Sequence, residues 1–343
     1  MRMWLIVCAL CCLLANTARG AEDKTWQLRD GHWREMASRP HALGPAVPDP
    51  VLDYVDRLVA QHDYHNAKKV LIKWVKTHNK NSPNRDRAIF IFSNIFYQDD
   101  DRFKSFFYCD ELMDEYPESK LFQAALQRQF DIAQAYMDGY KDKLLGMRIV
   151  DEGAESVQMM WRIQQRAPGS PLAQQAMLST ADYYFNDRDY DLAEDCYNTY
   201  VKNYPNSDDV PRVMLRAAFS SLAQFRGTKF DASSLIDARA QLMQIQREYP
   251  QLAADENVQT VLDQIDSAFC RKMLDTGDFY ERTHEPRGAA YEYRFLAQTY
   301  PASPEAAEAR RHLADMPALI LADAPPPPAG GYAPATEPSA SAQ

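Results

Sequence analysis

The chain has 343 residues, of which 48 are acidic and 38 are basic, so its formal net charge at pH 7 is −10. An acidic protein of this kind is disfavoured as a nucleic-acid binder, because phosphate backbones are recognised by clustered lysine and arginine. It has 12 glycines and contains no glycine-rich phosphate loop, Gly-x-Ser-x-Gly elbow or His-Glu-x-x-His motif. We therefore expect no catalytic residues, no cofactor and no bound metal.

The first expected element is an export signal. Residues 1–20 contain an early arginine, an apolar run that begins at Trp4 and small residues before Ala21, which is the pattern of a cleaved secretory signal. The run is shorter than the ~20 apolar residues of a membrane-spanning helix. An uncleaved N-terminal anchor is the alternative. Neither Cys11 nor Cys12 follows the Leu-small-small pattern of a lipoprotein signal, although an acylated Cys12 stays open as a second alternative.

Residues 21–48 form the second region. Trp26, Leu28 and Trp33 alternate with polar residues about an Asp-Gly pair at 30–31, which predicts a small β-hairpin or extended segment. A proline-rich linker follows it.

A repeated helical frame fills residues 49–316. Mostly apolar residues recur at offsets 0, +4, +7, +8 and +11, which fall on one stripe of an α-helix. A proline, which stops a helix, follows at +12 in five of the six copies. The copies begin at Ala67, Ser105, Ser156, Ala193, Ala238 and Ala289. This self-similarity predicts an all-α fold, a tetratricopeptide-type α-solenoid of stacked antiparallel helix pairs.

The turns between the helices carry their own signals. Serines such as Ser170 and Ser303 follow the proline stops, where they can cap the next helix. Within a unit, an Asp-aromatic-x-x-Ala pattern marks the turn between its two helices. The copies are spaced more widely than the roughly 34 residues of a tetratricopeptide unit, which indicates inserts. We expect these inserts at residues 138–155, 227–235 and 271–286.

The last region, residues 317–343, contains four consecutive prolines, a Gly-Gly pair and a Ser/Ala end. Such a composition cannot bury a core, so we expect a disordered tail. A spacer is the simpler interpretation of this tail, and a polyproline ligand for a partner is the alternative.

Two patterns resemble metal sites. His62 and His65 stand beside Asp63, and residues 99–101 are three consecutive aspartates. The histidines fall in an expected turn with no further ligand nearby, and the aspartates lack the alternate spacing and glycine of a calcium loop. We expect both to be solvated turns.

Stacked helix pairs offer a long concave surface for an extended peptide or a partner helix. The expected first helices of four units lie at residues 86–97, 123–136, 174–185 and 210–225. The first of them is apolar on more than one face, so something must cover the excess. Neighbouring helices are the simpler answer. The alternative hypothesis is an apolar peptide groove to which Phe92, Phe96, Tyr136 and Tyr183 contribute.

Several joints between the helices resemble those of one family. The segments are Ala-Pro-Gly-Ser-Pro at 167–171, Asp-Tyr-Asp-Leu-Ala at 189–193, Tyr-Pro-Asn-Ser at 204–207 and Tyr-Pro-Ala-Ser-Pro at 300–304. Together they resemble the tetratricopeptide domain of BamD-type outer-membrane assembly proteins, and the resemblance covers about residues 49–316.

The resemblance implies a non-enzymatic periplasmic scaffold at the inner face of the outer membrane. Its partners would be the β-barrel assembly machinery and unfolded outer-membrane proteins, and the chain would reach the membrane peripherally through a partner. The absent lipoprotein motif, the N-terminal segment and the proline-rich tail depart from the family. A general periplasmic tetratricopeptide adaptor for another envelope or cell-division complex is the alternative, and an enzyme or metal-binding protein is the third.

Overall fold

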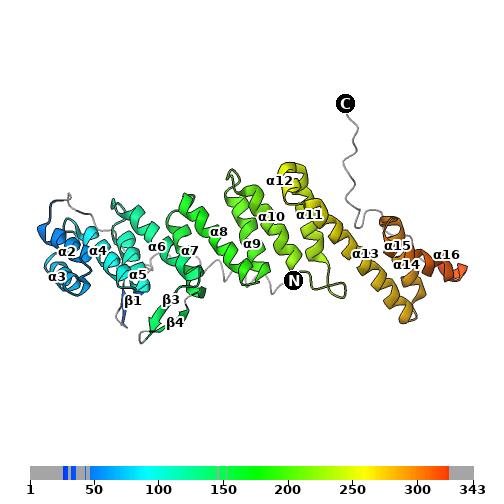
Figure 1. The fold of residues 1–343 in the computed structure, drawn as a ribbon, viewed down its shortest axis with the longest axis horizontal. Coiled ribbons are helices and arrows are strands. Elements are labelled where there is room, and N and C mark those ends of the chain that lie inside the picture. The colour runs from blue at the N-terminus through cyan, green and yellow to red at the C-terminus, as the bar shows by residue number, and fades with distance from the viewer. Residues whose placement is uncertain are drawn as a thin grey trace, which may run out of the picture. The chain divides into compact units, whose positions relative to one another are not determined.

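The computed structural model describes residues 26–29, 32–35, 43, 47–144, 147–151 and 153–323. The chain divides into two compact units, residues 1–159 and 160–343, with the boundary inside one helix. The helices and strands of both units are drawn in Figure 1. Each unit is described by itself. The expected signal peptide at 1–20 lies outside the described residues.

The first unit is a stack of antiparallel helices in which each helix packs on the next along the chain. Helices α2 and α3 form one pair, α4 and α5 the next, and α6 opens a third. Their bounds are α2 Pro50–Ala60, α3 Tyr64–Thr77, α4 Arg85–Gln98, α5 Arg102–Glu115 and α6 Phe122–Met137.

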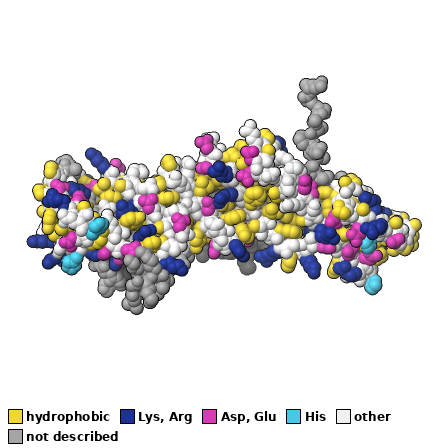
Figure 2. Space-filling view, viewed as in Figure 1, with side chains coloured by type: hydrophobic (Ala, Val, Ile, Leu, Met, Phe, Trp, Pro, Cys, Tyr) yellow, Lys and Arg dark blue, Asp and Glu magenta, His cyan; other side chains and the backbone are white. Residues whose placement is uncertain are grey.

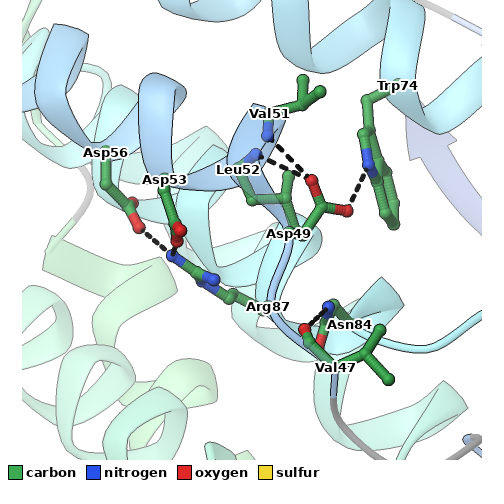
Figure 3. Close-up of polar contacts among 9 residues, drawn as sticks. All are labelled: Val47, Asp49, Val51, Leu52, Asp53, Asp56, Trp74, Asn84 and Arg87. Carbon is green, nitrogen blue, oxygen red and sulfur yellow. Dashed lines mark hydrogen bonds and ion pairs between the residues drawn. The ribbon is translucent and has the colours of Figure 1, made fainter.

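Polar contacts hold the start of this stack together (Figure 3). Asp49 caps α2 by accepting from the backbone N–H of Val51 and Leu52 at 2.9 and 3.1 Å. The second carboxylate oxygen of Asp49 accepts from Nε1 of Trp74 on α3 at 2.8 Å. One residue therefore ends the linker, begins a helix and ties that helix to its partner.

The expected N-terminal hairpin is present. Strands β1 Trp26–Arg29 and β2 His32–Glu35 are antiparallel, with Trp26 opposite Glu35. A second hairpin follows α6, where β3 Lys141–Leu144 pairs with β4 Met147–Asp151. It occupies the insert expected at 138–155, but its strands were not predicted.

The second unit begins within α7, and from α8 to α15 each helix again packs on the next along the chain. Its bounds are α7 Gly153–Arg166, α8 Pro171–Asn186, α9 Tyr190–Asn203, α10 Val210–Ala223, α11 Ser233–Glu248, α12 Pro250–Asp255, α13 Val258–Arg282, α14 Pro286–Thr299, α15 Pro304–Asp315 and α16 Ala318–Asp323. The chain is thus an all-α, tetratricopeptide-type solenoid, as predicted.

The six copies of the sequence frame are the helices α3, α5, α7, α9, α11 and α14. In every copy the residues at offsets 0, +4 and +7 are buried, because these positions face the neighbouring helices. In four copies the helix ends at a tyrosine cap that immediately precedes the frame's proline. Ser170 and Ser303 cap α8 and α15 through their side chains, as expected.

The turns within the helix pairs share one geometry. A left-handed residue stands two positions before the second helix, with φ between 60° and 68°. The next residue occupies the N-cap position of that helix. The backbone N–H of this N-cap residue donates to the carbonyl five residues earlier, as Asp63 does to Leu58 at 2.9 Å. These left-handed residues are His62, Asp100, Arg188 and His284.

Two expectations differ from the structure. Residues 271–286 were expected to be an insert, but most of them belong to α13, a single helix of 25 residues. The disordered tail was expected from residue 317, but the apolar segment Ala318–Asp323 forms α16 and packs on α14. Residues 324–343 lie outside the described part. None of the described helices combines the length and the apolar character needed to cross a membrane.

Candidate peptide-binding surface

The four residues expected in an apolar groove are divided between the units. Phe92 and Phe96 lie on α4 and Tyr136 lies on α6, all in the first unit, whereas Tyr183 lies on α8 in the second. Phe92 and Tyr136 are 7% and 1% exposed. Neighbouring helices therefore cover both rings. For Phe92 this agrees with the simpler interpretation of the helix expected at residues 86–97.

Phe96 is partly buried at the edge of the first unit's core. Its ring stacks on Tyr108 of α5 with centroids 5.3 Å apart, and Tyr108 in turn stacks on Phe92 at 5.1 Å. The ammonium groups of Lys68 and Lys104 lie 5.3 and 5.5 Å from the centre of the Phe96 ring. The exposed part of Phe96 therefore belongs to an aromatic surface flanked by two lysines, which also form ion pairs with Asp99 and Asp101.

A second aromatic and basic cluster in the same unit was not expected from the sequence. The guanidinium carbons of Arg102 and Arg128 lie 5.2 and 4.1 Å from the centre of the Tyr97 ring, and Arg102 also lies 3.8 Å from that of Tyr140. Among the described residues, the buried Nε of Arg102 and Nη1 of Arg128 have no hydrogen-bond acceptor.

The second unit contains an apolar pocket of about 200 Å³ between α7, α8 and α9. Trp161 on α7 and Leu192 on α9 are both 41% exposed beside it. The volume lies below the roughly 300–1,000 Å³ of sites for drug-sized ligands, so it fits a single side chain of a peptide. The lining residues are Trp161, Gln164, Met177, Thr180, Tyr184, Leu192, Asp195, Cys196 and Thr199.

Gln164 gives this pocket a polar recognition element. Its side chain occupies the +8 position of the α7 frame and is 8% exposed. Among the described residues, its buried Nε2 has no hydrogen-bond acceptor. A buried donor left unpaired costs about 1–3 kcal/mol, so a peptide carbonyl would recover this bond only after the amide turns toward the pocket.

Apart from the Asp195 carboxylate, uncharged side chains line the pocket. Burial, and secondarily the charge of Asp195, raises the pKa of the Cys196 thiol to about 11. Burial also raises the pKa of the Tyr184 hydroxyl. A protonated thiol is a poor nucleophile, so this arrangement is suited to binding an apolar group and not to covalent chemistry.

The helices behind the pocket are tied together by polar contacts. The Tyr197 hydroxyl of α9 donates to Asp182 of α8 at 2.5 Å, and Arg216 of α10 forms an ion pair with the same carboxylate. Tyr183, the remaining residue expected in the groove, is next to this anchor and makes an edge contact with Tyr184, their ring centres 6.0 Å apart. Tyr183 is half-buried, and it directly precedes the pocket residue Tyr184 on α8.

Residues 150–317 match the model of the YfiO (BamD) family, which is described as an outer membrane lipoprotein. The matched residues include the apolar pocket and extend through α15. No curated protein matches the chain.

Three solved structures are similar at low identity. PilW, titled a widely conserved type IV pilus biogenesis factor, is 15% identical, with a TM-score of 0.27. The match covers 76% of this chain and 99% of PilW. The Pseudomonas aeruginosa pilF protein is 12% identical, with a TM-score of 0.28. The match covers 76% of this chain and 95% of pilF. The C-terminal part of a tetratricopeptide repeat-containing protein from Cytophaga hutchinsonii is 11% identical, with a TM-score of 0.25. The match covers 75% of this chain and 98% of that structure. TM-scores this low do not bear on function.

Proposed function

We propose that this chain is an exported, non-enzymatic scaffold that binds extended segments of partner proteins and contributes to assembly of outer-membrane β-barrel proteins. The match of residues 150–317 to a family described as an outer membrane lipoprotein is the observation that carries this proposal. The proposal places the chain in the periplasm at the inner face of the outer membrane, with the β-barrel assembly machinery or its unfolded clients as partners.

The pocket of α7, α8 and α9 supports a peptide ligand. Its size suits one apolar side chain, and Gln164 contributes a side-chain amide to its wall. Strands of membrane β-barrels alternate apolar and polar residues, so an unfolded barrel segment offers apolar side chains at every second position. Such a segment would place one side chain between Trp161 and Leu192.

The proposed experiment places a photo-crosslinking amino acid at position 192 of the full chain, which is expressed in its native cells. Leu192 and Ile236 are both 41% exposed and lie on helices of the same unit, but Ile236 does not line the pocket, which makes position 236 a matched control. We expect adducts with β-barrel proteins, or with a barrel-inserting partner, from position 192 and not from position 236. Adducts are identified by mass spectrometry.

Other outcomes would redirect the proposal. Adducts from position 192 that contain only cell-wall or division proteins would support the general adaptor in place of barrel assembly. Equal adducts from positions 192 and 236 would reject the pocket as a specific surface. Changing Gln164 to Leu removes the unpaired donor while keeping a similar volume, so it tests the carbonyl contact separately from the apolar one.

A further inference from the structure

A histidine and two carboxylates from distant parts of the sequence meet near the C-terminal end of the second unit. Asp278 and Glu281 lie three residues apart on α13, which places them on one face of that helix. His312 approaches them from α15. One ligand atom from each of the three residues lies within 4.8 Å of the others. Figure 2 shows acidic and histidine side chains gathered over the region of α13 to α15.

Tyr293 of α14 contacts all three of these side chains. Its hydroxyl lies 2.7 Å from Oδ1 of Asp278 and 3.0 Å from Oε2 of Glu281. Its ring stacks on the His312 imidazole with centroids 4.8 Å apart and an interplanar angle of 25°. Nδ1 of His312 lies 3.0 Å from Oε2 of Glu281. The imidazole nitrogen and the two carboxylates are therefore directed to one place by a buried ring.

The cluster has more acceptors than donors. The hydroxyl of Tyr293 offers one proton to the two carboxylates within its reach, and Nδ1 of His312 can offer one more to Glu281, so most carboxylate lone pairs have no donor within the cluster. Neither Asp278 nor Glu281 forms an ion pair with a lysine or arginine among the described residues. With a neutral imidazole the group carries a charge of −2, which a divalent cation would balance.

We propose that Asp278, Glu281 and His312 bind a divalent first-row transition-metal ion of the Zn²⁺ type. One imidazole nitrogen and two carboxylate oxygens form a ligand set that zinc accepts, with a fourth position left for water. Ligand atoms around a tetrahedral zinc stand roughly 3.3–3.6 Å apart, since each lies about 2.0–2.2 Å from the metal. Asp278 is partly exposed and Glu281 is exposed, so small side-chain rotations close the remaining distance.

The ligand types also exclude other ions. Ca²⁺ takes six to eight oxygen ligands and Mg²⁺ prefers an octahedron of oxygens, so a site with one nitrogen and two carboxylates favours neither. A bound ion would join α13 to α15 across α14. It would stabilise the last helices of the second unit, independently of the function proposed above.

The test measures Zn²⁺ binding to the full chain by competition with a chromogenic zinc chelator, with Mg²⁺ and Ca²⁺ as comparison ions. We expect one zinc per chain, bound more tightly than Mg²⁺ or Ca²⁺. His312→Asn and Glu281→Gln should weaken binding by at least the roughly 10–100-fold that loss of outer-sphere partners causes. His284→Asn is the matched control, because His284 is exposed in the same unit and asparagine tolerates its left-handed backbone.

Thermal unfolding provides a second measurement. Zinc at a 100-fold excess over its dissociation constant should raise the unfolding temperature of the unchanged chain and of the His284→Asn variant by about 5 °C, and that of Glu281→Gln much less. Glu281 is exposed, so its glutamine variant retains the fold if His312→Asn does not. Absence of zinc binding, or binding that survives both His312→Asn and Glu281→Gln, would overturn the proposal.

Discussion

The ring of Tyr293 on α14 lies directly against Gly277 on α13, so closely that a Cβ at position 277 would stand 2.7 Å from its Cδ1. Gly277 is buried within a helix of 25 residues, and its missing side chain is what allows the two helices to approach. Tyr293 is fully buried and is the +4 residue of its frame.

Gly277→Ala should therefore destabilise the second unit by about 1–3 kcal/mol, the usual cost of overpacking, despite the better helix propensity of alanine. Urea unfolding measures the change. Gly288→Ala is the matched control, because its Cβ would stand 3.0 Å from the ring of Tyr280, which is only partly buried and can shift. A Gly277→Ala chain as stable as the Gly288→Ala chain would show that Tyr293 moves without cost.

Asp49→Asn should weaken the first unit by about 1 kcal/mol. Asparagine can still cap α2 with its carbonyl oxygen, but its amide then faces the Trp74 N–H, and that hydrogen bond is lost. Chemical unfolding measures the effect. Asp53→Asn is the control, because Asp53 forms an exposed ion pair with Arg87, which keeps Asp56 as a second partner at 2.6 Å. Exposed pairs contribute little, so equal losses in the two variants would contradict the role given to Asp49.

The Cys196 thiol should react slowly. Its pKa of about 11, against an ordinary value of 9.0, leaves about 100-fold less thiolate at neutral pH. Iodoacetamide labelling of the native chain, followed by mass spectrometry of the Cys196 peptide, measures the rate against the same chain in urea. Asp195→Asn should accelerate labelling modestly, because the Asp195 charge is the secondary cause of the shift. Labelling at the unfolded rate would show that the thiol is not desolvated.

Stability should fall in alkali. Burial raises the pKa values of the hydroxyls of Tyr116, Tyr197 and Tyr300 above the ordinary value of 10.0. Below pH 10 these groups are protonated in both folded and unfolded chains. Above it the unfolded chain ionises first, so each tyrosine lowers the free energy of unfolding by about 1.4 kcal/mol per pH unit.

The variant Tyr197→Phe isolates one such contribution. Urea unfolding between pH 9 and pH 11.5 measures how the free energy of unfolding changes with pH. Above pH 10 this free energy should fall less steeply in the variant than in the unchanged chain, by about 1.4 kcal/mol per pH unit, because one ionising hydroxyl is missing. The constant loss from the missing hydrogen bond to Asp182 does not affect this slope. Parallel slopes would show that Tyr197 ionises equally in the folded and unfolded chains.

The half-exposed aromatic residues should matter more for partner capture than the buried ones. Phe96→Ala and Tyr183→Ala should each reduce capture of a crosslinked partner about five-fold or more, as loss of an interface aromatic does. Phe92→Leu preserves the core volume approximately and should change capture little, since Phe92 is 7% exposed. Capture that falls only with Phe92→Leu would indicate that core packing, and not the surface, controls binding.

The helix pairs were predictable because two independent signals coincide. The apolar stripe of each frame fixes the buried face, and the following proline fixes the helix end, so the tyrosine caps of α5, α9, α11 and α14 fall where expected. The strand β3, in contrast, reads Lys-Asp-Lys-Leu and has no apolar alternation to reveal it. The length of α13 was missed because an extra helical stretch without a frame resembles an insert.

The binding residues were less predictable than the fold. Aromatic content on α4 and α6 did not distinguish Phe92 and Tyr136, which face the core, from Phe96, which reaches its edge. The buried amide of Gln164, for which the described residues offer no acceptor, has no sequence signal, because its burial depends on the packing of neighbouring helices. The same holds for Asp278 and His312, which are brought together only by the packing of α13 on α15.

The shared turn geometry also bears on how the chain folds. Each turn closes through hydrogen bonds between residues at most five positions apart, and each helix packs mainly on its sequence neighbours. Low contact order of this kind favours fast folding, because little loop entropy is lost before the contacts form. A helix pair can therefore assemble from its own local contacts, and each completed pair offers the surface on which the next one packs.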